Sequence, residues 1–171
     1  MSCPGSTGLI APGWRYAPSM ADSTTSSINI ALPRASVMDV IADFAAYPEW
    51  ATGVRATEIV EKRSDGRASR VRFTLDAGVL RDRFVLRYQW DGDAQVRWDF
   101  DPAEPGLVIT ELSGGYLLAD SGSGTDVTYD LTIGVRIPMI AMVKRRAEKS
   151  IIDTALKGLK KRAENGGGAT T

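Results

Sequence analysis

The chain of 171 residues contains no histidine and a single cysteine, Cys3. The absence of histidine removes the commonest metal ligand, the usual general base and every Ser-His or Cys-His nucleophilic arrangement. One cysteine cannot form an internal disulfide, so the composition does not favour an oxidising compartment. We therefore predict no metal site and no cofactor.

Long apolar runs and an excess of one charge are also missing. No run approaches the roughly 20 residues that a membrane-spanning helix needs, and Leu9-Ile10-Ala11 is shorter than the core of a signal peptide, about 7 to 15 residues. Basic and acidic residues each number 21, which gives no reason to expect nucleic acid as a partner. We expect a cytoplasmic protein without stable membrane insertion.

The composition that remains, 43% hydrophobic and 25% charged, is typical of one globular domain. Residues 1–25 are rich in Gly, Pro, Ser and Thr without periodicity, which predicts a disordered extension, and Met20 is a second candidate for the true start. Residues 165–171 are predicted to form a flexible tail. The folded domain is therefore expected over residues 26–164.

The longest periodic segment runs from Met139 to Glu164. Apolar residues recur there at steps of three and four after Pro138, which predicts one long amphipathic helix. It carries eight basic and three acidic residues, and those basic residues that lie in its last turn suit the helix dipole. Gly158 costs about 1 kcal/mol relative to alanine inside a helix. We expect it either to permit close approach of the sheet or to mark a loosened helix end.

Alternation of apolar and polar residues predicts strands over residues 26–32, 53–63, 68–77, 80–90, 94–101, 107–120 and 125–137. Helical periodicity predicts a short helix over residues 34–44, and Tyr47-Pro48-Glu49-Trp50 predicts a second helical turn. Gly114-Gly115 indicates a bulge or a close backbone approach. Short turns require antiparallel neighbours. The predicted class is α+β, with a curved seven-stranded antiparallel sheet around the C-terminal helix.

Large apolar side chains fall on one face of this sheet. They can fill a core, or they can line a cavity in which tyrosine hydroxyls orient one polar ligand group. Alternation alone favours the filled core. The residues are Phe73, Leu75, Phe84, Leu86, Tyr88, Trp98, Tyr116 and Tyr129. Arg83 and Arg87 share the opposite, outer face with Val85 and are expected to be solvated.

Acidic residues near the predicted rim are Asp76, Glu111 and Asp130. Nothing in the sequence pairs two of them as a general acid and a general base. We therefore assign no catalytic residue.

Several short motifs occur in a defined order: Val37 and Ile41 before Tyr47-Pro48-Glu49-Trp50, Trp98 within a strand, Gly115-Tyr116-Leu117-Leu118, Gly124-Thr125-Asp126-Val127-Thr128-Tyr129, and Ile137-Pro138 before the last helix. This order resembles the START-like superfamily, in its polyketide cyclase/dehydrase and lipid-transport (SRPBCC) branch with coenzyme Q-binding relatives. The resemblance implies a helix-grip fold with an apolar cavity between sheet and C-terminal helix. It reverses the preference for a filled core, and Met142, Ile151 and Ala155 become the helix positions expected to contact a ligand.

Three functions stay open at this point. The leading hypothesis is non-catalytic binding or transport of an apolar small molecule, such as a lipid, an isoprenoid or quinone, or a polyketide. The second is a polyketide cyclase or dehydratase that uses tyrosine and carboxylate groups in the cavity. The third is a protein or ribosome interaction module whose contact surface includes Lys160, Lys161 and Arg162. The sequence leaves the oligomeric state open.

Overall fold

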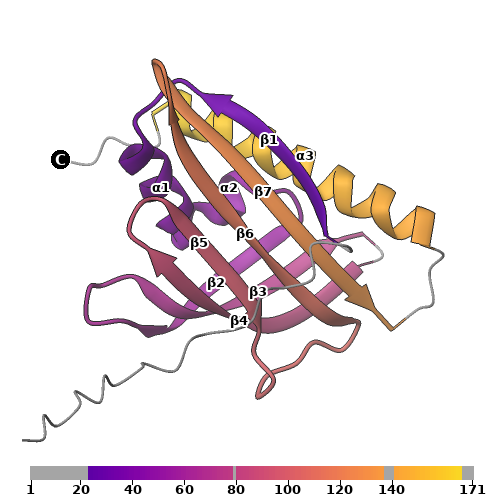
Figure 1. The fold of residues 1–171 in the computed structure, drawn as a ribbon. Helices are drawn as coiled ribbons and strands as arrows, with labels where there is room; N and C mark the ends of the chain where they lie inside the picture. Colours follow the sequence, from indigo (N-terminus) through magenta and orange to yellow (C-terminus); the bar gives the residue numbers. More distant parts are fainter. Residues whose placement is uncertain (1–22, 79, 137–140, 167–171) are drawn as a thin grey trace, which may run out of the picture.

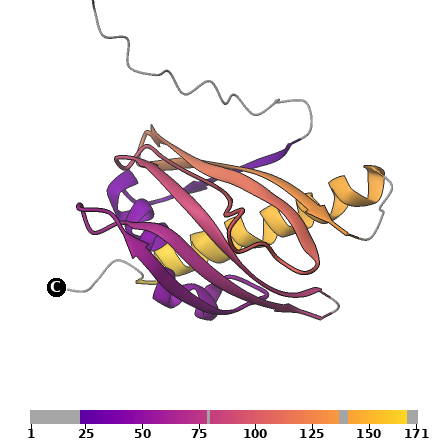
Figure 2. The same ribbon diagram turned by 90° about the horizontal axis from the view of Figure 1, so that it is seen from below.

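The computed structural model describes residues 23–78, 80–136 and 141–166. Seven antiparallel strands form one curved sheet in the order β1-β7-β6-β5-β4-β3-β2, with a long helix along its concave face (Figures 1 and 2). The strands are β1 (Thr24–Ile30), β2 (Val54–Lys62), β3 (Ala68–Ala77), β4 (Leu80–Asp91), β5 (Gln95–Phe100), β6 (Ile109–Ser121) and β7 (Gly124–Val135). The helical segments are α1 (Arg34–Ala42), the 3-10 helix η1 (Phe44–Ala46), α2 (Tyr47–Trp50) and α3 (Ala141–Glu164). The predicted fold class is confirmed.

β1 begins two residues before the predicted strand. Thr24 and Thr25, which the sequence assigned to the disordered extension, pair with Leu131 and Asp130 of β7. β-Branched side chains suit a strand, and the Thr24 hydroxyl also donates a hydrogen bond to Glu148 of α3 at 2.7 Å. The rest of the predicted extension, residues 1–22, and residues 167–171 of the predicted tail lie outside the described residues.

α3 packs on the sheet through a buried stripe, and burying one aliphatic side chain contributes roughly 1.5–3 kcal/mol. The stripe is Glu148, Ile152, Leu156, Leu159 and Ala163. Val143, which the predicted stripe included, is 48% exposed, because the first turns of α3 extend past the start of β1 (Figure 1). Met139 and Ile140, the predicted first helical residues, lie outside the described residues. No helix in the part of the chain that the structure describes is long and apolar enough to span a membrane.

The connection between β5 and β6 folds back over the outer face of the sheet. The backbone N–H of Asp101 donates to the Val85 carbonyl at 2.9 Å, and the Val85 N–H donates to the Glu104 carbonyl at 3.3 Å. Val85 is therefore fully buried, which corrects the expectation that it is solvated. Its strand neighbours Arg83 and Arg87 are exposed, as expected.

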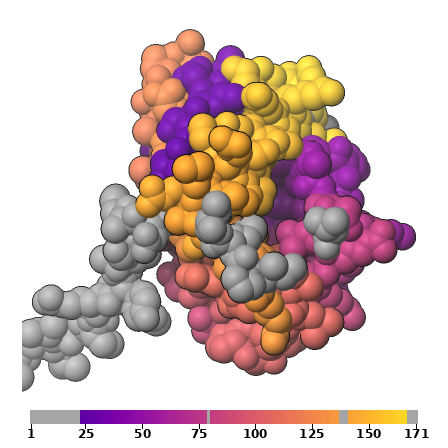
Figure 3. Space-filling view, turned by 90° about the vertical axis from the view of Figure 1, so that its right-hand side faces the viewer, coloured from indigo at the N-terminus to yellow at the C-terminus, as the bar shows by residue number. Residues whose placement is uncertain are grey.

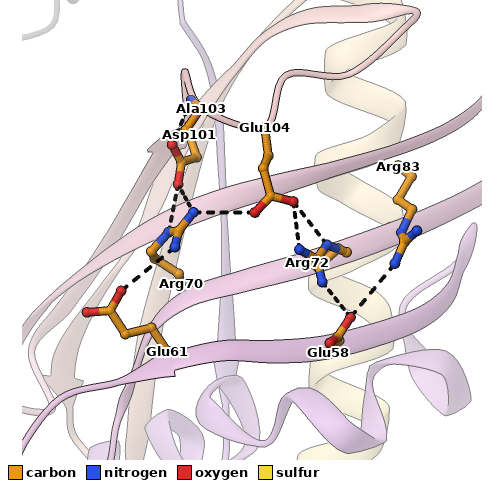
Figure 4. Close-up of polar contacts among 8 residues, drawn as sticks. All are labelled: Glu58, Glu61, Arg70, Arg72, Arg83, Asp101, Ala103 and Glu104. Atoms are coloured by element: carbon orange, nitrogen blue, oxygen red, sulfur yellow. Dashed lines mark hydrogen bonds and ion pairs between the residues drawn. The ribbon is translucent and has the colours of Figure 1, made fainter.

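Ion pairs hold this connection against β3 (Figure 4). Arg70 donates to Asp101 at 2.7 Å, and Arg72 donates to Glu104 at 2.6 Å. Arg72 also donates to Glu58 of β2 at 2.7 Å. These side chains are on the outer face, so the network joins neighbouring segments without bringing charge to the concave side.

Asp82, in β4, fixes the other end of the same connection. Its buried carboxylate accepts the backbone N–H groups of Leu107, Val108 and Ile109 at 2.8, 2.9 and 2.8 Å, and that of Arg83 at 2.8 Å. Hydrogen bonds to a carboxylate are stronger than neutral ones, and four of them offset much of the cost of burying its charge. Ile109 is thereby held at the edge of the concave face.

The glycine pair in β6 marks a close approach between neighbouring strands. A Cβ on Gly114 would collide with the backbone carbonyl oxygen of Asp130 in β7 and would stand 3.2 Å from the Trp98 ring, so a side chain at this position would push β6 away from β7. Close approach is therefore confirmed. The alternative of a bulge at this place is wrong, because the β6–β7 register shifts between Ile109 and Glu111 instead.

Candidate functional site

A cavity of about 340 Å³ lies between the concave face of the sheet and α3. This volume falls in the range of small-molecule sites, about 300–1,000 Å³. Met142 does not line it and is 71% exposed, because it belongs to the turns of α3 that extend past β1. The other predicted ligand contacts all line it: Phe73, Leu75, Phe84, Leu86, Tyr88, Trp98, Tyr116, Tyr129, Ile151 and Ala155.

The cavity opens between the connection from α2 to β2, the β3–β4 hairpin and the middle of α3. Figure 3 shows a hollow there, between the orange helix and the purple and magenta segments. The exposed wall residues are Thr52, Ala77, Ser150, Ile151 and Thr154. The opening is therefore edged by hydroxyl groups and small or aliphatic side chains.

Sequence reasoning missed the wall contributed by α2 and the connection after it. Tyr47 and Trp50 line the cavity together with residues 51–54. The sequence assigned the motif around Pro48 only to a helical corner. Two aromatic residues three apart share one side of a helical turn, and this spacing was the available signal. The remaining wall residues, such as Leu112 and Ile133, continue the inward alternation of β6 and β7.

Glu148 anchors the first half of α3. Its side chain is fully buried, accepts the Ile133 N–H at 3.1 Å and the Thr24 hydroxyl at 2.7 Å, and lies 3.8 Å from Lys144 Nζ. A buried carboxylate is tolerated when it is paired and hydrogen-bonded. No periodicity identified this residue, because a glutamate in an amphipathic helix is expected to face solvent.

Gly158 anchors the second half of α3. A Cβ at this position would stand 2.7 Å from the Trp50 carbonyl oxygen, a contact that real side chains do not make. The expected close approach therefore exists, but its partner is α2 rather than the sheet. The alternative of a loosened helix end is not observed, since α3 continues to Glu164.

Four side chains form an aromatic row across the cavity floor: Tyr88, Trp98, Tyr116 and Tyr129. Tyr116 of β6 pairs with Tyr129 of β7, and Tyr88 of β4 pairs with Trp98 of β5. Ring centroids are 4.5 Å apart between Tyr116 and Tyr129, 5.5 Å between Trp98 and Tyr116, and 5.9 Å between Tyr88 and Trp98. Because the row spans four neighbouring strands, its geometry is fixed by the register of the sheet.

The hydroxyl groups of this row have spare hydrogen-bonding capacity. Tyr47 nearby donates to the Ile41 carbonyl at 2.8 Å, whereas Tyr88, Tyr116 and Tyr129 make no hydrogen bond within residues 23–78, 80–136 and 141–166. Burial raises the pKa of Tyr88 and Tyr116 well above the ordinary value and also raises the pKa of Tyr129; neighbouring tyrosines add to the shift at Tyr88 and Tyr116, and Asp130 adds to it at Tyr129. All three are therefore protonated O–H groups at neutral pH.

No charged side chain lines the cavity among the residues that the structure describes. Asp76 pairs with Arg81 at 2.9 Å, and Asp130 pairs with Arg97 at 3.1 Å. Glu111 is exposed and outside the cavity wall. The described wall thus combines apolar surface with neutral hydrogen-bonding groups, and it contains no carboxylate for acid–base chemistry.

A curved sheet that grips a C-terminal helix over an apolar cavity defines the START-like helix-grip class. The chain belongs to the polyketide cyclase / dehydrase and lipid transport family, whose model matches residues 21–164. A search of curated proteins found no match to this sequence.

Solved structures similar to this chain support the same fold. A START superfamily protein from Mycobacterium smegmatis is 19% identical with a TM-score of 0.76, over 84% of this chain and 97% of that chain. A protein from Thermus thermophilus is 22% identical with a TM-score of 0.68, over 84% and 97%. The Zhui aromatase/cyclase from a Streptomyces species is 15% identical with a TM-score of 0.64, over 84% and 93%. At these identities the likeness concerns the fold.

Proposed function

We propose that this protein binds and carries a hydrophobic small molecule, lipid, quinone or polyketide-like, between the sheet and α3 without changing it chemically. The observation that carries the proposal is an open cavity of about 340 Å³ whose described wall is apolar and uncharged. Apolar ligands gain roughly 25 cal/mol for each Å² that they remove from water. A cytoplasmic location and the absence of a nucleic-acid partner stay predictions from the sequence.

The cyclase hypothesis is less well supported. General acid–base chemistry on a polyketide needs a proton acceptor within hydrogen-bond reach of the substrate. The chain has no histidine, and the described cavity wall has tyrosines but no carboxylate. The name of the Streptomyces protein describes that protein's activity, and the residues here favour binding over turnover.

Two of the three residues named for the interaction hypothesis make internal bonds. Lys160 Nζ donates to the Asn29 carbonyl at 2.6 Å, and Arg162 pairs with Glu49 at 2.7 Å. These side chains hold α3 to β1 and α2. Because these basic side chains have a structural role, the cavity is the better-supported functional feature.

Native mass spectrometry of freshly purified protein and titration with an apolar fluorescent probe test the proposal. Ala155→Phe places a ring in the cavity, and Met142→Phe is a matched control on an exposed position outside it. We expect wild type and Met142→Phe to bind the probe alike and Ala155→Phe to bind it at least about 10-fold more weakly, which corresponds to about 1.4 kcal/mol. Equal binding by a folded Ala155→Phe, or no uptake by wild type, would overturn the proposal.

A further inference from the structure

We propose that the cavity prefers uncharged ligands that present a carbonyl oxygen to the hydroxyls of Tyr88, Tyr116 and Tyr129, over ligands of the same shape that carry a carboxylate. This inference rests on the proposed function, because it concerns the chemistry of the ligand in the same cavity. It draws on the aromatic row and on the charge of the surrounding wall, which are two separate observations.

The first observation is the set of unpaired hydroxyls. Tyr116 and Tyr129 lie side by side with ring centroids 4.5 Å apart, and Tyr88 is on the same wall. Their O–H groups have no partner in the described part of the chain, unlike that of Tyr47. Each of these O–H groups can donate to a ligand acceptor while the rings and the surrounding wall pack against the apolar part of the ligand. A ligand carbonyl would supply that acceptor.

The second observation is the absence of a counter-ion along the described wall. A carboxylate loses much of its hydration on entering an apolar site and needs a cationic partner to compensate. Arg97, in the strand that carries Trp98, is already paired with Asp130 at 3.1 Å and does not line the cavity. Neutral O–H donors can hydrogen-bond a carboxylate but cannot neutralise it, so desolvation of the charge disfavours the ionised ligand.

The cavity mouth offers an ionised ligand a different position. Ser150 and Thr154 also border a shallow surface groove that carries Arg146 and Lys157. A carboxylate held there would remain hydrated, with its apolar part inside. Binding of that kind would not depend on the three tyrosine hydroxyls, which makes the two arrangements separable by substitution.

Three naphthalene probes of matched size test the inference by calorimetry: isopropylnaphthalene, acetylnaphthalene and naphthoate. They differ in carrying no oxygen, a neutral carbonyl or an ionised carboxylate at neutral pH. For the wild-type protein we expect acetylnaphthalene to bind at least about 10-fold more tightly than naphthoate, because both ligands accept hydrogen bonds but only naphthoate brings an uncompensated charge into the apolar site. Equal or tighter binding of naphthoate would overturn the inference.

The triple variant Tyr88→Phe, Tyr116→Phe, Tyr129→Phe supplies the second arm. We expect it to bind acetylnaphthalene about 10-fold more weakly than wild type and isopropylnaphthalene within about 2-fold. An equal change for both probes, or unchanged acetylnaphthalene affinity, would overturn the role of the hydroxyls. If the triple variant does not fold, the same two affinities are measured for the three single variants. Failure of all three probes to bind wild type would count against the proposed function itself.

Discussion

The carboxylate of Glu148 in α3 accepts the backbone N–H of Ile133 in β7 at 3.1 Å. β1 pairs with β7 as far as Thr24 and Leu131, so Ile133 lies just past the end of that ladder. A side chain of the helix therefore satisfies a strand N–H where the neighbouring strand has not yet begun. The same carboxylate accepts the Thr24 hydroxyl, which joins the helix to both strands.

Replacing Glu148 with alanine leaves the Ile133 N–H and the Thr24 hydroxyl without their acceptor. We expect Glu148→Ala to lower the free energy of unfolding by about 3 kcal/mol, since each unpaired buried group costs about 1–3 kcal/mol. Glu148→Gln keeps an acceptor of similar size and should lose about 1 kcal/mol. Urea denaturation at neutral pH measures both, and an alanine variant as stable as wild type would contradict the anchoring role.

Replacing Gly158 with alanine should destabilise the protein, although alanine favours an isolated helix by about 1 kcal/mol. The new Cβ would stand 2.7 Å from the Trp50 carbonyl oxygen, so α3 and α2 must separate. We expect a net loss of about 1–3 kcal/mol, as for other overpacked contacts. Thermal unfolding gives the result, with the exposed substitution Lys161→Ala as control. A gain in stability for Gly158→Ala would contradict this prediction, because it would show that α3 and α2 separate at little cost in free energy.

Replacing Asp82 with asparagine should reveal a pH-dependent contribution to stability. Burial alone would raise the pKa of Asp82, but four backbone N–H donors together outweigh it and lower the pKa below its ordinary value. Because the folded-state pKa is the lower one, the stabilisation is present above the unfolded-state pKa and is lost as pH falls through the folded-state pKa. We expect Asp82→Asn to be about 2 kcal/mol less stable at neutral pH, with a gap that narrows below about pH 4.

Urea midpoints measured across this acidic range check the prediction for Asp82. Asp120→Asn is the control, because the Asp120 side chain is 73% exposed and should give a small gap at every pH. A gap for Asp82→Asn that stays constant down to acid pH would mean that the carboxylate charge contributes nothing.

The buried tyrosines predict cooperative unfolding in alkali. Burial raises the pKa of Tyr47, Tyr88, Tyr116 and Tyr129 above the ordinary value. A raised pKa gives stability that is present below the unfolded-state pKa, about 10, and is lost as pH rises toward the folded-state value. We expect these phenols to ionise in one step together with loss of the near-ultraviolet circular dichroism. The measurement uses a Tyr16→Phe variant, so that the only phenols that ionise are those of the four buried tyrosines. Gradual ionisation with the fold intact would contradict the prediction.

Periodicity predicted most of the fold, since each strand contributes local apolar alternation and α3 contributes a helical stripe. It could not predict what covers a given face. Val85 follows the outward alternation of Arg83, yet the β5–β6 connection folds over it. Met142 and Val143 follow a helical pattern, yet the first turns of α3 extend past the start of β1 and have no strand of the sheet to pack on.

Local sequence patterns could not predict the cavity. Alternation placed Tyr88 and Trp98 on the concave face, but a filled core gives the same alternation. The open space depends on how far α3 stands from the sheet. Contacts between distant parts of the sequence set that distance, namely Glu148 with Thr24 and Ile133, and Gly158 with Trp50. Contacts of this kind cannot be recognised from the periodicity of a short sequence segment.

The residues of α3 that fix the position of the helix differ from those that face the cavity. Glu148 and Gly158 fix the position of the helix, whereas Ile151 and Ala155, between them, face the cavity and bond to neither anchor. A substitution at Ile151 or Ala155 can change the size of ligand that the cavity accepts, while the contacts of Glu148 and Gly158 are retained. The size of the cavity and the position of the helix that closes it are therefore set by different residues of α3.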